Sequence, residues 1–343
     1  MTPSAIVKHL NQHVVGQDDA KKILAVAVYT HFRKAARSMS DSIEIAKSNI
    51  LLIGSTGTGK TLMCETLSRV LGVPFVTADA ASLAQSQFVN NEIEAILQRL
   101  LEKASGDVAR AQKGIVFIDE VDKLKAVSGQ SRSASGESVQ HALLKIMEGS
   151  QVRLKDGTYV DTTQILFICG GAFVGLDDIL KNSTQLGYIS ISADDNQRVL
   201  NSLNTRVKPT DLLAFGLIPE FAGRLPIIAR LQDLNREAMV RIMTEPKNSI
   251  YNQFREILKS DNVELVIEPA VFEQISDLAM EYKAGARSLR GIFERLMTDV
   301  LYVIPDNPKI RKVVIASLFE DAKFFGDGAA AAAPTAAATP PKA

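Results

Sequence analysis

Short hydrophobic runs alternate with longer amphipathic segments through the first two-thirds of the chain. Five runs have the length of buried strands, at residues 49–53, 75–78, 114–118, 164–169 and 227–231. Several are hydrophobic almost throughout, which is the pattern of parallel strands covered on both faces. Between them, apolar residues recur at helical spacing in residues 61–71, 92–104 and 137–148. The alternation predicts an α/β domain of three layers, with helices on both faces of a parallel sheet.

The pattern changes after about residue 235. Helical periodicity continues over residues 236–258, 269–282 and 288–303, with two short β-like runs at 263–267 and 313–316. We therefore expect a large domain over residues 1–234 and a smaller, mostly helical α+β domain over residues 235–325. From Gly326 the sequence reads GDGAAAAAPTAAATPPKA and has almost nothing to bury. Residues 326–343 are accordingly expected to form a disordered tail.

Composition restricts the class of protein further. Lys plus Arg and Asp plus Glu both number 39, and this zero net charge argues against a protein that coats nucleic acid. Cys64 and Cys169 lie in no CxxC or Cys/His cluster, which excludes a disulfide scaffold and favours a reducing compartment. The start lacks the pattern of a signal peptide, and no apolar run approaches the roughly 18 residues that span a bilayer. We expect a cytoplasmic protein without membrane contact.

A phosphate-binding loop follows the first predicted strand. Residues 54–61 read Gly-Ser-Thr-Gly-Thr-Gly-Lys-Thr, the GxxxxGK[ST] pattern, between a buried strand and an amphipathic helix. Glycines let such a loop curl so that backbone N–H groups face phosphate oxygens at the positive end of a helix. ATP contacts are expected from Ser55, Thr56, Gly57, Thr58, Gly59, Lys60, Thr61 and Leu62. Lys60 would reach the β- and γ-phosphates, and Thr61 would bind Mg²⁺.

Two adjacent carboxylates end the third predicted strand. Asp119 and Glu120 follow the apolar run Ile115–Ile118, at the end of the strand where α/β sheets place their ligands. Asp119 is expected to hold Mg²⁺ and Glu120 to polarise the attacking water. An acidic cap between a strand and a helix would have the same letters, but the phosphate-binding loop upstream favours hydrolysis of ATP.

Longer strings beyond these motifs resemble the ClpX protein unfoldases. They are IDEVDK at residues 118–123, SGESVQHALLKIMEG at 135–149, ILFICGGAF at 165–173, FGLIPEFAGRLP at 215–226 and GARSLR at 285–290. The resemblance implies an AAA+ fold, ATP and Mg²⁺ as cofactors, and a homohexameric ring. It also implies that protein substrates are threaded through a central pore, often into a ClpP-type peptidase.

The resemblance assigns roles to residues at matching positions. Val14, Val15, Gly16 and Gln17 correspond to the segment that packs on the adenine. Arg224 corresponds to the arginine finger that reaches a neighbouring subunit's nucleotide, and Arg287 to the second sensor arginine. Phe88 and Val89 correspond to the first pore loop, and Arg132 to the second. Leu186, Gly187 and Tyr188 stand where the family has its peptidase-docking tripeptide.

The sequence departs from that family in several places. Gln87-Phe88-Val89-Asn90 replaces Gly-Tyr-Val-Gly in the first pore loop, and Leu-Gly-Tyr replaces Ile-Gly-Phe in the docking tripeptide. Ser55 replaces a Pro, and an Arg-Lys-His element is missing after Gly149. The four zinc-binding cysteines of an N-terminal domain are also missing, so we expect a form without that domain. Phe88 as a core aromatic and Leu186–Tyr188 as an ordinary loop are the alternative interpretations.

Three other functions compete with unfolding. They are a remodeller of protein complexes that has no peptidase partner, a nucleic-acid motor, and a scaffold that binds nucleotide without hydrolysing it. Zero net charge and the Phe88-Val89 pair argue against the motor. The acidic pair Asp119–Glu120 and the arginines 224 and 287 argue against an inactive scaffold.

Overall fold

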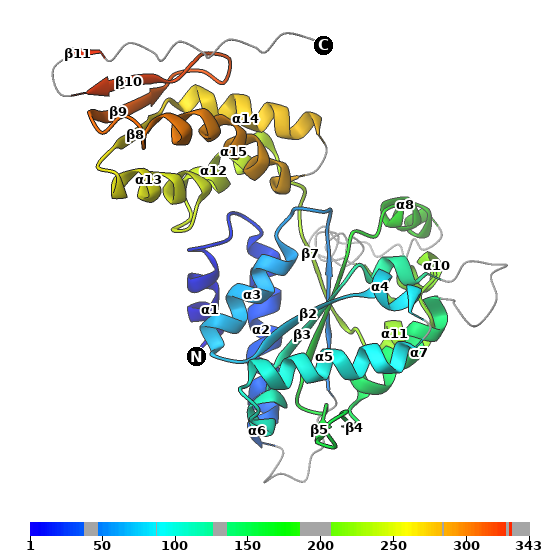
Figure 1. Ribbon diagram of the computed structural model, residues 1–343. Helices are drawn as coiled ribbons and strands as arrows, with labels where there is room; N and C mark the ends of the chain where they lie inside the picture. The colour runs from blue at the N-terminus through cyan, green and yellow to red at the C-terminus, as the bar shows by residue number, and fades with distance from the viewer. Residues whose placement is uncertain are drawn as a thin grey trace, which may run out of the picture. The chain divides into compact units, whose positions relative to one another are not determined.

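The chain folds into two compact units in the computed structural model (Figure 1). The structure describes residues 1–37, 47–86, 88–125, 136–185, 207–282, 285–326 and 329–330. Unit 1 comprises residues 1–10, 17–55 and 59–233, and unit 2 comprises residues 11–16, 56–58 and 234–343. Each unit has its own hydrophobic core.

A parallel sheet of five strands forms the centre of unit 1. Its strands are β1 (Ile50–Ile53), β2 (Phe75–Asp79), β3 (Ile115–Asp119), β6 (Leu166–Gly171) and β7 (Ile227–Arg230). Their order across the sheet is β2-β3-β6-β1-β7, and every neighbouring pair is parallel. The α/β fold with a parallel central sheet is thereby confirmed. Because all strands run the same way, their carboxyl ends lie along one edge of the sheet.

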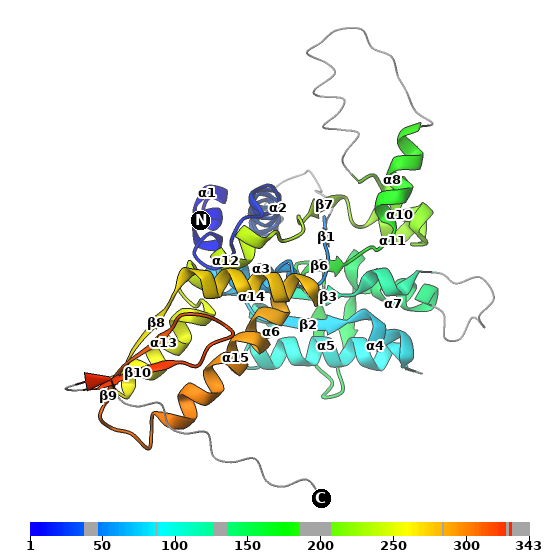
Figure 2. The same ribbon diagram turned by 90° about the horizontal axis from the view of Figure 1, so that it is seen from above.

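Helices flank this sheet (Figure 2). The helices of unit 1 are α1 (Pro3–Leu10), α2 (Asp18–Arg37), α3 (Lys60–Leu71), α4 (Ala80–Gln85), α5 (Val89–Lys103), α6 (Val108–Ala111), η1 (Val121–Leu124), α7 (Gly136–Glu148), α8 (Leu176–Gln185), α10 (Pro209–Phe215) and α11 (Pro219–Gly223). Helix α2 packs beside β7, α5 beside β2, and α3 against β3 and β6. Of the described helices, none is both long enough and apolar enough to cross a membrane.

Several elements of unit 1 were not predicted, among them the short helices α4, α6, η1, α8, α10 and α11. Helices α1 and α2 were missed, although Asp18 and Asp19 in the first turn of α2 are a helix-start signal. The hairpin of β4 (Gln151–Arg153) and β5 (Tyr159–Asp161) was also missed. Its signal is the Asp156-Gly157 pair, because Gly157 has the positive φ of 87° that a tight turn requires.

Unit 2 combines, within its described residues, four helices with a small sheet. The helices are α12 (Arg236–Thr244), α13 (Ile250–Ser260), α14 (Pro269–Glu281) and α15 (Ala286–Val303), and the strands are β8 (Glu264–Ile267), β9 (Ile310–Ile315), β10 (Lys323–Gly326) and β11 (Ala329–Ala330). Strand order is β11-β10-β9-β8. Stacked rings of Phe254, Phe272 and Phe293 lie in its core.

The prediction of one helix over residues 236–258 was wrong. The segment forms α12 and α13, because Pro246 has no N–H to continue the first helix. Ser249 then caps the second helix, with its Oγ accepting a hydrogen bond from Asn252 N at 3.2 Å. Strands β10 and β11 were also not predicted, and they extend the sheet past residue 325.

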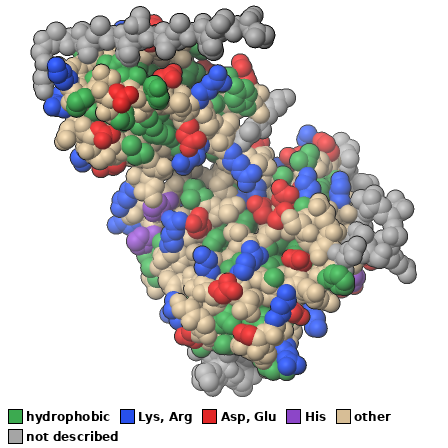
Figure 3. Space-filling model, in the orientation of Figure 1, with side chains coloured by type: hydrophobic (Ala, Val, Ile, Leu, Met, Phe, Trp, Pro, Cys, Tyr) green, Lys and Arg blue, Asp and Glu red, His purple; other side chains and the backbone are tan. Residues whose placement is uncertain are grey.

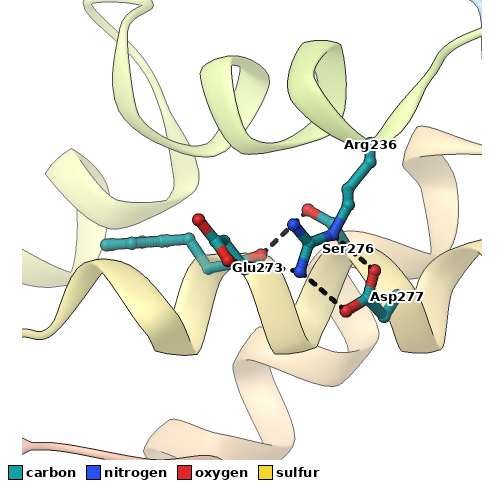
Figure 4. A network of polar contacts seen from close by, with 5 residues as sticks. Arg236, Glu273, Ser276 and Asp277 are labelled. Atoms are coloured by element: carbon teal, nitrogen blue, oxygen red, sulfur yellow. Dashed lines mark hydrogen bonds and ion pairs between the residues drawn. The ribbon is translucent and has the colours of Figure 1, made fainter.

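A network of ion pairs fixes the start of α12 on α14 (Figure 4). Arg236 donates from Nε to Asp277 Oδ1 at 2.6 Å and from Nη2 to Asp277 Oδ2 at 2.9 Å. Its Nη2 also lies 3.2 Å from Glu273 Oε2. These hydrogen bonds raise the pKa of Arg236 and lower the pKa of Asp277. The paired geometry is one that Lys cannot reproduce.

The chain's two cysteines both lie in the interior of unit 1. Cys64 is on α3 and Cys169 on β6, and neither forms a disulfide. Burial raises the pKa of both thiols, that of Cys169 to about 12. Neither thiol is therefore a nucleophile at neutral pH.

Candidate nucleotide-binding and hydrolysis site

The predicted phosphate-binding loop connects β1 to α3. Gly54 continues the sheet by donating its N–H to Gly171 O on β6 at 3.1 Å. Gly57 and Gly59 have positive φ angles of 84° and 101°, which glycine adopts without strain. Met63 N then donates to Gly59 O at 2.9 Å, so α3 begins directly after the loop. The loop thus has the curled backbone and helix start that anion binding requires.

Lys60 folds back into this loop. Its Nζ donates to Gly54 O at 2.5 Å and to Ser55 O at 3.1 Å, and the residue is 7% exposed. Thr61 follows it in the first turn of α3, half-buried, and Leu62 is exposed. The loop therefore holds an ammonium group and a hydroxyl at a helix N-terminus, the donor set that phosphate and Mg²⁺ need.

Asp119 and Glu120 lie at the carboxyl end of β3. Asp119 Oδ1 accepts a hydrogen bond from Glu120 N at 2.9 Å. Glu120 has φ 59° and ψ 31°, a left-handed conformation that is unusual for a residue with a side chain. Such backbone strain gathers at active sites, where the surrounding structure holds it in place. Here the left-handed residue is the one predicted to polarise water.

Strand β6 lies between the loop and the two carboxylates and ends in two glycines. A Cβ on Gly170 would lie 2.6 Å from the Phe117 ring and 3.2 Å from Asp119 Oδ1. A Cβ on Gly171 would lie 2.6 Å from Asp122 Oδ1. Only glycine therefore lets Asp119 at the end of β3 and Asp122 in η1 approach β6 this closely. This requirement was not predicted, although a Gly-Gly pair that ends a strand signals close approach.

Asp122 is a further residue near the site that was not predicted. It is 5% exposed, and its Oδ2 accepts a hydrogen bond from Phe173 N at 3.3 Å. Its Oδ1 is buried without a hydrogen-bond partner among the described residues. Asp122 thus links η1, directly after Glu120, to the segment that follows β6.

The donor set fits Mg²⁺ bound together with nucleotide. Within the described ranges, no three or more His, Cys, Asp or Glu side chains cluster to form a metal cage. Mg²⁺ is usually held by one or two protein groups together with substrate phosphates and water. Asp119, which ends β3, and Thr61, in the first turn of α3, are the residues that would supply these groups.

Ser55 makes a side-chain contact that the sequence did not predict. Its hydroxyl donates to Asp233 Oδ1 at 2.5 Å, and Asp233 is the last residue of unit 1. Next to it, the Gln17 amide donates to Gln232 O and accepts from Gln232 N, both at 2.8 Å. Gln17 has a positive φ of 60° and follows Gly16, whose φ is 63°. These bonds connect the loop and residue 17 to the end of the sheet beyond β7.

Arg224 directly follows α11 and forms an ion pair with Glu148, the last residue of α7. Arg224 Nε lies 2.9 Å and Nη2 2.7 Å from the same oxygen, Glu148 Oε1. Both side chains are exposed, at 45% and 41%. The structure thus describes the predicted arginine finger in contact with a carboxylate of its own chain.

The structure describes some of the other predicted residues, and the rest fall outside the described ranges. Phe88 is 67% exposed just before α5, which excludes its interpretation as a core aromatic, while Val89 packs against the core. Val14 and Val15 are buried, as is Thr58 in the loop. Arg287 is the second residue of α15, in unit 2. Arg132 and Leu186–Tyr188 fall outside the described residues.

A groove of about 1210 Å³ runs between α2 and β7. It borders the loop at Gly54 and Ser55 but is not lined by Lys60, Asp119 or Glu120. Acidic and basic side chains are interspersed on the face of unit 1 that Figure 3 shows. That distribution differs from the one-sign basic stripe of a nucleic-acid-binding face.

Comparison with known proteins gives matches across both units. Residues 45–228 match the AAA domain (Cdc48 subfamily), and residues 234–312 match the C-terminal D2-small domain of ClpB protein. The ClpX ATP-binding subunit of the ATP-dependent Clp protease from Bacteroides thetaiotaomicron is 44% identical over 323 residues, which cover 90% of this chain and 78% of that protein.

Two further ClpX subunits are similar to the same extent. The one from Azotobacter vinelandii is 43% identical over 333 residues, covering 90% of this chain and 76% of the relative. The one from Bacteroides fragilis is 44% identical over 319 residues, covering 88% and 77%. The family resemblance stated from the motifs is confirmed.

Proposed function

This chain belongs to the ClpX family of AAA ATPases, and on that premise we propose how it acts as an ATP-dependent protein unfoldase. The observation that carries the proposal is the edge of the sheet at the end of β6. There, Gly54 of the loop is hydrogen-bonded to Gly171, and Gly170 lies against Asp119. One strand thereby sets the spacing between the phosphate-binding loop and the carboxylates of hydrolysis.

The residues at this edge take different roles in hydrolysis. The loop amides and Lys60 bind the β- and γ-phosphates of ATP, and Thr61 and Asp119 hold Mg²⁺. Bound Mg²⁺ neutralises charge on the phosphates. Glu120 orients the attacking water and accepts its proton, and the rigid left-handed backbone at this residue fixes where the carboxylate lies. Val14–Gln17 and Arg287 complete the nucleotide contacts in this proposal.

The proposed working form is a homohexameric ring. Arg224 would reach the nucleotide of the next subunit and stabilise the charge that develops on the transferred phosphoryl group. A site that borrows a residue from its neighbour is active only in the ring. The proposal places this assembly in the cytoplasm, as the sequence predicts.

Phe88 is the residue proposed to grip the substrate. Its ring is 67% exposed, and an exposed aromatic group can pack against any side chain of an extended polypeptide. Val89 and Arg132 are proposed to join it at the pore. The relatives are named as subunits of a Clp protease, and delivery to a ClpP-type peptidase through Leu186, Gly187 and Tyr188 is part of the proposal.

Paired assays of binding and turnover test the assignment of Glu120. We expect Glu120→Gln to bind ATP like the parent but to lose hydrolysis by a factor of about 100 to 10,000, because it lacks the general base. Glu245→Gln, an exposed carboxylate on unit 2, is the matched control and should hydrolyse ATP at the parent rate. A Glu120→Gln protein with parental turnover overturns the assignment.

ATP-dependent unfolding of a stable tagged fluorescent protein tests the activity. The parent should unfold it and Phe88→Ala should not. Degradation only when ClpP peptidase is added supports delivery, whereas unfolding without degradation favours a remodeller. ATP turnover that rises with DNA and not with protein substrate overturns the unfoldase in favour of a nucleic-acid motor.

A further inference from the structure

The ion pair between Arg224 and Glu148 has a geometry that leaves one edge of the guanidinium for another partner. Both Nε and Nη2 are bound by the same oxygen, Glu148 Oε1, at 2.9 Å and 2.7 Å. Among the described residues, no hydrogen bond or ion pair is seen at Nη1. The edge formed by Nη1 and the second hydrogen of Nη2 is the one that binds a phosphate with two parallel hydrogen bonds.

A buried amide holds the backbone on both sides of this pair. Asn49 is fully buried, directly before β1, and its Nδ2 donates to Arg224 O at 3.1 Å and to Met147 O at 3.3 Å. Met147 precedes Glu148 in the last turn of α7. One side chain therefore ties together the arginine, the residue before its carboxylate partner, and the strand that leads to the phosphate-binding loop.

Folding stability does not explain why a carboxylate stands at position 148. Glu148 is the last residue of α7, where the helix dipole disfavours a negative charge. The pair is also largely exposed, and exposed ion pairs contribute little to stability. What the carboxylate does provide is a fixed orientation for one guanidinium.

We propose that Glu148 is a positioning residue for Arg224. It binds the guanidinium by the Nε edge so that the opposite edge is presented to the nucleotide of the neighbouring subunit, while Asn49 fixes the backbone from which both side chains project. The proposal rests on the proposed function, in which Arg224 acts between subunits. It predicts that Glu148 acts only through the arginine of its own chain.

Mixed rings test this prediction directly. Arg224→Ala subunits retain Glu120 but have no finger, and Glu120→Gln subunits retain the finger but do not hydrolyse ATP. Mixing them should restore turnover, because the fingers of one kind serve the sites of the other. The donor of the finger is then changed to Glu120→Gln/Glu148→Ala. We expect the restored rate to fall roughly 10- to 100-fold, the effect of misplacing a catalytic group by about 1 Å.

Two matched donors distinguish positioning from a general defect. Glu148→Gln keeps an oxygen that accepts from Nε and Nη2, so its donor should restore most of the rate. Glu245→Ala removes an Arg–Glu pair of similar exposure and Nε–Oε1 distance, that of Arg241, and should restore all of it. The KM for ATP and the size of the ring should match the parent in every donor, since Glu148 is not among the residues proposed to bind the nucleotide of its own subunit.

The outcomes separate this proposal from the function on which it rests. Full restoration by the Glu148→Ala donor, or a rate above that of the Glu120→Gln donor, overturns positioning by Glu148 while leaving the arginine finger intact. A Glu148→Ala protein that no longer forms rings also overturns it, in favour of a structural role. Failure of the first mixture to recover any turnover instead overturns the finger itself, and with it the premise.

Discussion

Replacing Asn49 perturbs a buried polar side chain that joins the start of β1 to α7 and Arg224. In the parent, its Nδ2 donates to two carbonyl oxygens, and its Oδ1 is buried without a partner among the described residues. Asn49→Ala removes both donors. Met147 O belongs to the last turn of α7, where carbonyl groups have no N–H partner within the helix. The Asn49 amide supplies the missing donor, and Asn49→Ala removes it.

The size of the effect follows from these groups. Met147 O, whose hydrogen bond is buried, costs about 1–3 kcal/mol without its donor, the part-buried bond to Arg224 O is worth about 1 kcal/mol, and deleting the unpartnered Oδ1 returns about 1–3 kcal/mol. The net loss of unfolding free energy is therefore about 1 kcal/mol. With a urea m-value near 2 kcal/mol/M, the midpoint of the transition of unit 1 should fall by about 0.5 M.

Asn49→Asp is a stronger perturbation at the same buried position. It keeps the shape of the side chain but directs a second acceptor at two carbonyl oxygens. Burial opposes ionisation of the new carboxyl, so its pKa in the folded state is raised above the unfolded value of about 3.9. The unfolded chain then loses its proton first as pH rises, and stability falls with rising pH. Asn49→Asp should be less stable than Asn49→Ala, and less stable at pH 8 than at pH 5.

Urea unfolding followed by far-UV circular dichroism measures both variants, because the chain has no Trp for fluorescence. Asn91→Ala, which removes an exposed amide on α5, is the control and should unfold near the parent midpoint. A parental midpoint for Asn49→Ala, or an Asn49→Asp protein as stable as the parent at pH 8, would show that the two carbonyls do not depend on this amide.

Three other features give measurable expectations. Ser55→Ala and Asp233→Asn each remove the hydrogen bond between the two side chains, and each should weaken ATP binding about two- to fivefold, which corresponds to roughly 0.5–1 kcal/mol. The double variant should bind no more weakly than either single variant, and titration calorimetry in a double-mutant cycle measures this. Burial lowers the pKa of His31 from 6.5 to about 4, so the unfolded chain takes up the proton first and the free energy of unfolding should fall as pH drops from about 6.5 to 4. His31→Gln should remove this fall in urea unfolding, and an unchanged fall would assign it to another group. The free energy of unfolding of Glu120→Gly should exceed that of Glu120→Ala by about 1 kcal/mol, because only glycine adopts the left-handed backbone without strain. Equal stabilities of the two variants would contradict that strain.

Much of the fold was predictable because the central strands are hydrophobic nearly throughout. Runs such as Leu166–Cys169 are buried on both faces, and burial of that kind leaves a pattern within a few neighbouring residues. Elements governed by a single residue were harder. Pro246 divides one long periodic segment into α12 and α13, and Asp156-Gly157 makes a hairpin that hydrophobic periodicity cannot reveal.

The local parts of the site were also predictable, and its non-local contacts were not. The phosphate-binding loop and Asp119-Glu120 are local motifs, so the sequence was enough to propose them. The contacts that arrange them are not local: Gly170 faces Asp119 only because β6 lies beside β3, and Asn49 meets Arg224 only because β1 passes near α7 and α11. Strand order is decided by how whole elements pack, so no pattern within a short window contains it.

The two interior cysteines have a practical consequence for experiments on this molecule. Since both thiols are buried and their pKa values are raised, maleimide dyes at neutral pH should leave the native chain unlabelled. A cysteine introduced at an exposed position such as Tyr302 can then carry a fluorophore without removal of Cys64 or Cys169. The two natural thiols also report local unfolding of unit 1. The rate at which mass spectrometry detects their alkylation measures how often they become exposed.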